Sequence, residues 1–312
     1  MTEPLRPLNL GGILDRGVQI FRAQPLLFFG LGAIPGLAQL GSALAAVHPK
    51  TTTDPTAVHI SLVMASYGAS LVFWVAKIVL QAIATAAICL AASRVQFGEA
   101  VSVQSAFGAF TSKGGRLVGL TFLEGIYAGW PFIVAAFISV GMATSGASIL
   151  LQAPVWILGA IPCVALYTRY ALAFPATAME DLPAQSAIQR SINLGEGGRW
   201  RICGGFVVPA VPALALAAGS AALVGSLKTY SPLLTGGPFA VAGINGIVGL
   251  IVALVFTPYS AIVLTLLYYD QRIRREGFDI EQMMAAAGLN PTATLPAPDV
   301  PVASAVPEEG QA

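Results

Sequence analysis

Residues Leu266–Gln282 read LLYYDQRIRREGFDIEQ, and they join a long apolar run to a dense cluster of charge. The run before this cluster, 240–269, contains no charged residue, whereas seven of the twelve residues in 270–281 are charged. Charge placed directly against so long an apolar segment is typical of a helix that crosses a bilayer and ends in water. The stretch therefore predicts a membrane-spanning helix with a charged exit.

The tyrosines and arginines of this stretch are predicted to fix the helix end at the membrane surface. Tyr268 and Tyr269 are expected at the level of the lipid headgroups, where amphipathic rings are favoured. Three arginines are expected to anchor the exit on the positively charged side: Arg272, Arg274 and Arg275.

Part of this charge is expected to be neutralised within the helix itself. Asp270 and Arg274 are four residues apart, and so are Arg272 and Glu276, which places each pair on one face of a continuing helix. Gly277 then offers a place for the helix to end.

The composition of the whole chain agrees with a lipid environment. Of the 312 residues, 56% are hydrophobic and only 10% are charged, and the mean hydropathy is +0.76. Soluble domains carry about 25% charged residues, so an aqueous surface cannot be built from this sequence. The net charge of +1 gives no reason to expect nucleic acid as a partner.

Six apolar stretches are long enough to cross a hydrocarbon core of about 30 Å as helices. They are 25–47, 60–93, 117–140, 150–175, 202–226 and 240–269. We therefore predict an all-α polytopic transmembrane bundle of about six helices that forms a single integral domain over 1–289. The Pro- and Ala-rich segment 290–312 is expected to be disordered.

The distribution of basic residues predicts the orientation of this bundle. Twelve of the sixteen Lys and Arg residues fall on one side of the spans, and only Lys50 and Lys228 fall on the other. Lys77 and Arg169 lie within spans. The positive-inside rule then places both termini in the cytoplasm.

A short amphipathic segment precedes the first, third and fifth spans. These segments are 10–24, 98–113 and 184–199. Each carries one apolar stripe and is expected to form a helix lying in the membrane interface. Because Leu14, Val101 and Ile188 occupy similar places at intervals of 87 residues, the sequence predicts three units, each an interfacial helix followed by a hairpin of two spans.

Four polar residues inside the predicted spans are candidates for function. Lys77 is far from both ends of its helix, and Gln81 shares its face one turn later. Lys77 either lines a polar cavity or reaches backbone carbonyls or water with its stem. Glu124 and Arg169 are both expected roughly 10 Å from the cytoplasmic side. We therefore predict an ion pair between them, or a network through Tyr167 or Tyr170, which fixes helix register in preference to carrying chemistry.

Catalytic and cofactor-binding patterns are not found in the sequence. The two histidines, His48 and His59, lie with Asp54 in one Thr- and Pro-containing loop, where a solvated loop is favoured over a metal site. No phosphate-binding GxxxxGK[ST] motif occurs. We therefore expect no catalytic residues, no metal and no cofactor.

Three stretches resemble a known group of proteins. They are LRPLNLGGILDRGVQIFRAQP (5–25), LGEGGRWRI (194–202) and YYDQRIRREGFDIE (268–281). They resemble a group of bacterial six-span proteins that is similar to the membrane domain of some glycerophosphoryl diester phosphodiesterases. The catalytic domain of those enzymes has no counterpart in this chain, so the resemblance implies the membrane domain without the activity. In the middle stretch, three residues are expected to anchor the topology: Arg199, Trp200 and Arg201.

These features lead to two functional hypotheses. The first is a non-enzymatic accessory or scaffold protein that contacts anionic lipid headgroups on the cytoplasmic side, with possible envelope protein partners. The second is a transporter or lipid flippase with a polar path along Lys77, Gln81, Glu124 and Arg169. An enzyme acting at the membrane surface is a more distant third.

Overall fold

The computed structural model of the chain describes residues 8–45, 60–146, 148–230 and 238–286. Within these ranges all regular structure is helical, as predicted. The helices are α1 (Leu10–Ala23), α2 (Pro25–Ala45), α3 (Ile60–Gln96), α4 (Val103–Thr111), α5 (Gly114–Thr144), α6 (Ile149–Tyr170), α7 (Ala173–Glu180), α8 (Ala184–Gly195), α9 (Arg199–Tyr230), α10 (Pro238–Glu276) and α11 (Phe278–Ala286).

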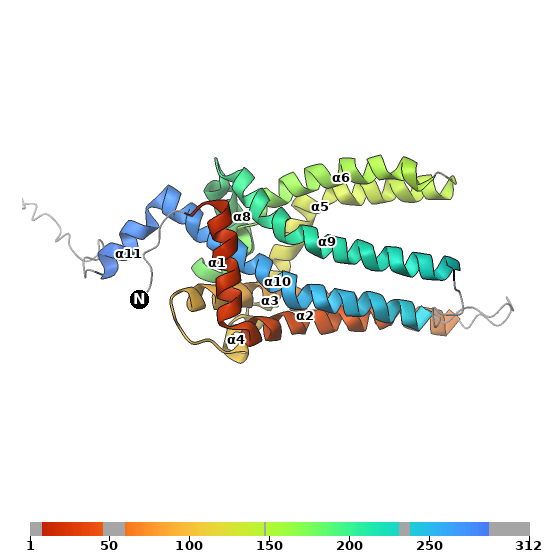
Figure 1. Cartoon of the computed structure of the whole chain (residues 1–312), viewed down its shortest axis with the longest axis horizontal. Helices are drawn as coiled ribbons and strands as arrows, with labels where there is room; N and C mark the ends of the chain where they lie inside the picture. Colours follow the sequence, from red (N-terminus) through yellow and green to blue (C-terminus); the bar gives the residue numbers. More distant parts are fainter. Residues whose placement is uncertain (1–7, 46–59, 147, 231–237, 287–312) are drawn as a thin grey trace, which may run out of the picture.

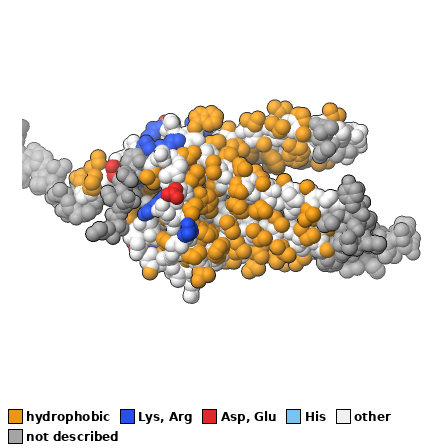
Figure 2. Space-filling view, in the orientation of Figure 1, with side chains coloured by type: hydrophobic (Ala, Val, Ile, Leu, Met, Phe, Trp, Pro, Cys, Tyr) orange, Lys and Arg blue, Asp and Glu red, His pale blue; other side chains and the backbone are white. Residues whose placement is uncertain are grey.

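The long helices run side by side, and the short helices gather at one end of the bundle (Figure 1). We call this end, which holds α1, α4, α7 and α8, the basic end, because the Lys and Arg side chains collect there (Figure 2). Helix α10 is the centre of the bundle and packs against α2, α3 and α9. The α5–α6 hairpin forms a separate arm, which diverges from α9 away from the basic end (Figure 1).

Six helices are long and apolar enough to cross a membrane: α2, α3, α5, α9, α10 and the α6–α7 segment. Large apolar side chains on their surfaces are exposed, among them Phe137 at 76%. A water-facing protein buries such side chains, whereas lipid accepts them at no cost. The chain is therefore a multi-pass membrane protein. Four of the six spans agree with the predicted ranges to within four residues at the described ends, and α10 continues seven residues past the predicted end at 269.

The fourth span is interrupted inside its predicted range of 150–175, because α6 ends at Tyr170 and α7 begins at Ala173. Pro175 lies in the first turn of α7, where its missing N–H leaves no helical hydrogen bond unmade. Proline alone does not explain the break, since α6 contains Pro154 and Pro162 without interruption. Ser191 of α8 satisfies the broken ends: its hydroxyl donates to the Arg169 carbonyl at 3.0 Å and accepts from the Leu172 amide at 3.1 Å.

The three predicted units are present, since a short helix is followed by two long helices three times along the chain: α1–α2–α3, α4–α5–α6 and α8–α9–α10. Leu14 and Ile188, which are 174 residues apart, are each the fifth residue of a helix, whereas Val101, midway between them, precedes α4, so the interval of 87 residues does not hold for α4. The short helices are also packed more deeply than expected. In α1, the buried residues are Ile13, Gly17 and Ile20, each one position before a residue of the predicted apolar stripe of Leu14, Val18 and Phe21.

Close approach of backbones holds α2 to α10. A Cβ atom added to Gly32 would lie 2.5 Å from the Ala253 carbonyl oxygen, so only glycine permits this separation. Towards the basic end the packing becomes continuous, and the ten residues 261–270 of α10 are all buried. The core therefore leads directly into the charged stretch that follows residue 269. The predicted disordered tail, 290–312, lies outside the described residues.

Candidate functional site

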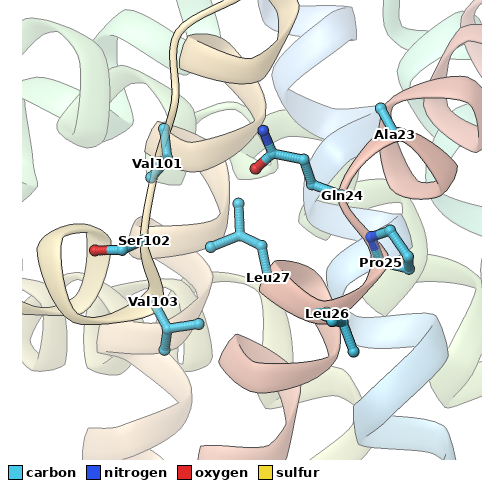
Figure 3. A pocket seen from close by; sticks show the side chains of 8 residues that line it. All are labelled: Ala23, Gln24, Pro25, Leu26, Leu27, Val101, Ser102 and Val103. Atoms are coloured by element: carbon cyan, nitrogen blue, oxygen red, sulfur yellow. The ribbon is translucent and has the colours of Figure 1, made fainter.

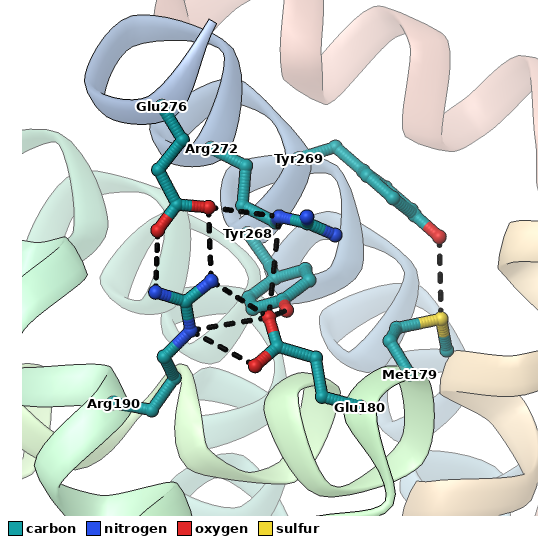
Figure 4. Close-up of polar contacts among 7 residues, drawn as sticks. All are labelled: Met179, Glu180, Arg190, Tyr268, Tyr269, Arg272 and Glu276. Atoms are coloured by element: carbon teal, nitrogen blue, oxygen red, sulfur yellow. Dashed lines mark hydrogen bonds and ion pairs between the residues drawn. The ribbon is translucent and has the colours of Figure 1, made fainter. Parts of the chain in front are cut away.

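A single guanidinium group joins three helices at the basic end (Figure 4). Arg190 of α8 donates from Nε and Nη2 to the carboxylate of Glu180 on α7, both at 2.9 Å. It also donates from Nη2 to Glu276 of α10 at 2.9 Å and from Nη1 to the other oxygen of that carboxylate. The fork geometry of arginine permits this double bidentate contact, which a lysine cannot make.

Two more residues of α10 complete this group, which we call the Glu180 cluster: Glu180, Arg190, Tyr268, Arg272 and Glu276 (Figure 4). The Tyr268 hydroxyl donates to Glu180 Oε1. Arg272 Nε lies 3.1 Å from Glu276 Oε2 and 3.9 Å from Glu180 Oε1. Two acids thus face two arginines, and hydrogen bonding by Glu276 raises the pKa of the Arg190 guanidinium above its ordinary value.

The adjacent Tyr269 connects α10 to two further helices. Its hydroxyl donates its single proton to Met179 Sδ of α7, at 3.2 Å. The Ser93 hydroxyl of α3 lies 2.7 Å from the same tyrosine oxygen and is therefore the donor in that second hydrogen bond. Tyr268 is 0% exposed and Tyr269 is 6% exposed. Both side chains are therefore enclosed by the protein, where they join helices, and are not exposed as the rings of a membrane-surface belt are; the headgroup depth predicted for them stays a prediction.

Asp270, an acid outside the Glu180 cluster, connects the first described residue of the chain to the bundle. Asp270 is 3% exposed, and its Oδ2 lies 3.0 Å from Arg201 on α9 and 3.0 Å from Arg274. Its other oxygen accepts the Leu8 amide at 3.0 Å, while both arginines donate to the Leu8 carbonyl. The predicted pairs Asp270–Arg274 and Arg272–Glu276 are confirmed, and Gly277, at φ +65°, ends α10 as expected.

Asp181 is an acid at the surface of the same end. Asp181 follows α7 in the left-handed conformation, at φ 54°. Its carboxylate accepts from Lys113 Nζ at 2.7 Å and from Arg116 Nη1 at 2.9 Å. The hydrogen bond from Lys113, followed by the charges of both basic groups, lowers the pKa of Asp181 below its usual value of 3.8.

The sequence analysis missed Glu180, Asp181 and Arg190 as site residues. The signal that could have found them is the short stretch MEDLP (179–183), which places two adjacent acids among many cations on a charge-poor chain. Acids in such a place are expected to pair with the basic residues nearby. Which cation each acid would select depends on helix packing, and no sequence spacing contains that information.

The four intramembrane candidates are not brought together. Gln81 donates to Thr85 Oγ1 of its own helix at 3.3 Å, and Lys77 is partly exposed on α3. Glu124 is 5% exposed with no hydrogen-bond partner for Oε1, whereas Arg169 is exposed. No ion pair within 4.0 Å joins Glu124 to any described residue, so the predicted pair with Arg169 is wrong.

The predicted topology anchors divide into two groups. Arg201, Arg272 and Arg274 are engaged in ion pairs within the protein, and Arg275 donates to the Glu196 carbonyl. In contrast, Arg199 is exposed and forms no ion pair with a described residue. The same holds for two other exposed arginines of the basic end, Arg22 and Arg169. Trp200 is 88% exposed, as suits a ring at a membrane surface.

Two hollows lie near these exposed residues. The first has a volume of about 470 Å³ and lies between the α1–α2 elbow and the segment before α4; Gln24 and Leu27 point into it (Figure 3). The second has a volume of about 540 Å³ and lies between α6 and α9. We call it the α6–α9 groove. Its lining residues are Ala160, Ile161, Val164, Ala165, Thr168, Arg199, Trp200 and Cys203.

The arrangement as a whole can bind and neutralise charge at one end of an apolar bundle. Within the described ranges, no group of three His, Cys, Asp or Glu side chains is placed to hold a metal ion. The loop with His48 and His59 lies outside the described residues. No protein-family model, no curated protein and no solved structure matches this chain. The resemblance to the phosphodiesterase membrane domain therefore stays a prediction.

Proposed function

We propose that this chain is a non-enzymatic accessory or scaffold protein of the bacterial inner membrane, with its basic end in the cytoplasm. There it contacts anionic lipid headgroups and offers a rigid surface to envelope proteins. One observation carries this proposal: the arginines of the basic end fall into two sets, one paired with acids and one exposed. Internal acids neutralise one set, while Arg169 stays exposed at the end of α6 and Arg199 stays exposed next to Trp200 at the beginning of α9.

The rigidity of the basic end supports a scaffolding role over a moving one. The Glu180 cluster joins α7, α8 and α10, and Asp270 joins α9, α10 and the start of the chain. Polar groups that are held by several charged partners from different helices resist relative motion of those helices. A transport cycle would have to break these contacts or move around them.

The transporter hypothesis has less support from the geometry. Among the described residues, no hydrogen bond or ion pair connects any two of the four polar side chains of its predicted path. Glu124 is enclosed, and Arg169 belongs to the exposed surface at the basic end. A continuous polar route through the bundle would require these groups to face one cavity.

The experiment that tests the proposal measures lipid preference. Purified protein in mild detergent is exposed to phosphatidylglycerol and phosphatidylcholine with identical acyl chains, and retained lipids are counted by native mass spectrometry. We expect severalfold greater retention of phosphatidylglycerol, because each surface arginine contributes about 1 kcal/mol towards an anionic lipid. Equal retention of the two lipids would contradict the proposal.

A further inference from the structure

We propose that the α6–α9 groove is a binding site for one anionic phospholipid of the leaflet at the basic end. The phosphate lies between Arg169 and Arg199, and an acyl chain lies along the α6 wall of the groove. This inference rests on the proposed contact with anionic lipid and assigns that contact to one place in the fold.

The groove is charged at its mouth and mainly apolar along its wall, which matches a phospholipid with a charged headgroup and apolar chains. Arg199 and Trp200 lie at its mouth, at the beginning of α9. The α6 wall consists of Ala160, Ile161, Val164, Ala165 and Thr168. Only Thr168 has a polar side chain, and its hydroxyl donates to the Ala165 carbonyl of the same helix. A soluble anion would use only the mouth, whereas a lipid would fill both parts.

A second arginine is positioned by the register of α6. Arg169 follows Ala165 by four residues, so it lies on the same helix face one turn nearer the basic end. Its side chain is exposed and forms no ion pair with a described residue. Arg199 thus lines the groove from α9, and Arg169 lies one residue beyond Thr168, the last lining residue of α6. Neither is neutralised by an internal acid as Arg190 and Arg201 are.

The dimensions of the groove fit a lipid of one leaflet. From Thr168 to Ala160 the α6 wall extends about 12 Å, at about 1.5 Å per residue. One leaflet contributes about half of a hydrocarbon core of about 30 Å. The volume of about 540 Å³ lies in the range of ordinary ligand sites. A partner transmembrane helix would instead need an apolar contact across the full thickness of the bilayer.

The fold keeps this groove open on the lipid side. Helices α6 and α9 meet through the rings of Tyr167 and Phe206, whose centroids are 4.6 Å apart. Beyond this contact the two helices diverge, and the α5–α6 arm stands apart from the rest of the bundle (Figures 1 and 2). A groove with this shape can receive a lipid sideways from the bilayer without any rearrangement of the bundle.

The test uses the full chain and phosphatidylglycerol as the probe. Native mass spectrometry gives the affinity for the first retained lipid, with phosphatidylcholine of the same acyl chains as reference. We expect Arg199→Gln and Arg169→Gln each to weaken retention about fivefold, as suits the loss of one cation near a lipid phosphate. Ala165→Phe should abolish the tightly bound lipid, because the larger side chain fills the apolar part of the groove.

Two matched controls separate the groove from the general surface. Arg22→Gln removes the same charge from the end of α1, and Ala153→Phe adds the same ring to an exposed position of α6 that does not line the groove. Both should retain the lipid as the unchanged protein does. If Ala165→Phe fails to stay monodisperse, the two exposed arginine variants still decide the question.

The outcomes distinguish the site from the function. Preference for phosphatidylglycerol that is lost in the groove variants and kept in the controls supports the site. The same preference kept in every groove variant overturns the groove assignment and leaves the proposed function standing. No preference in the unchanged protein overturns both. Full displacement of the lipid by millimolar inorganic phosphate would show a soluble anion to be the occupant and would also overturn the assignment.

Discussion

Replacing Arg190 by glutamine should destabilise the basic end more than any comparable charge removal at its surface. The change deletes the guanidinium that binds Glu180 and Glu276 together. Two carboxylates are then left to share Arg272, which lies 3.1 Å from one and 3.9 Å from the other. The helices α7, α8 and α10 lose the group that connects all three.

The magnitude follows from the burial of the pair. Removing one partner of a fully buried ion pair costs about 3–5 kcal/mol, whereas an exposed pair contributes about 0–1 kcal/mol. The side chains of Arg190, Glu180 and Glu276 are 26%, 23% and 30% exposed, so the cost lies between these limits. We expect a loss of about 2–3 kcal/mol, or a midpoint lowered by about 3–5 °C for a chain of this size.

The assay is thermal unfolding in mild detergent, followed by the loss of the monodisperse peak in size-exclusion chromatography. Arg22→Gln is the matched control, because it removes an exposed charge that has no ion pair with a described residue. Arg190→Lys should lie between the two, since an ammonium group keeps the charge but cannot make the forked contact. Equal midpoints for Arg190→Gln and Arg22→Gln would refute the structural role of the cluster.

Three further predictions concern other parts of the chain. Gly32→Ala should lower the unfolding midpoint, because its Cβ would lie 2.5 Å from the Ala253 carbonyl oxygen. Gly119→Ala is the control and should be neutral, because its Cβ would have nothing within 4 Å. Equal effects of the two variants would contradict the close approach of α2 and α10. Asp181 has a folded pKa below its unfolded value of 3.8, so its contribution is present above that value and is lost as the pH falls through the folded pKa. Asp181→Asn should therefore lower the midpoint at neutral pH but not in strong acid, and a pH-independent difference would speak against this. Glu124→Gln should keep or raise the midpoint, because a neutral isostere replaces an enclosed carboxyl whose Oε1 lacks a partner; a large fall would reveal a contribution from the carboxylate.

The helical spans could be predicted because each is encoded locally. A run of about twenty apolar residues identifies a span whatever it packs against, since the bilayer itself selects it. The ends of α10 could be predicted for the same reason. Gly277 ends the helix through its own backbone freedom, and the pairs at i,i+4 need only the helix that contains them.

The contacts between helices could not be predicted in this way. Glu124 and Arg169 were expected at similar depth, but α6 ends at Tyr170, so Arg169 is exposed at the end of its helix, whereas Glu124 lies ten residues into α5 and is enclosed. Tyr268 and Tyr269 have the composition of a membrane-surface belt, but α3, α7 and α10 enclose them. In both cases the neighbouring helices, and the place where each helix ends, decide what a side chain faces.

The sequence by itself determined that this is a membrane protein of six spans, with short amphipathic helices and most of its cations at one end. Hydropathy and charge act over a few residues, so the chain states them directly. Only the tertiary structure decided which cations form ion pairs with internal acids and which stay exposed near the α6–α9 groove. That division depends on distances of about 3 Å between residues far apart in the chain, as between Arg190 and Glu276, and such distances exist only once the helices have packed.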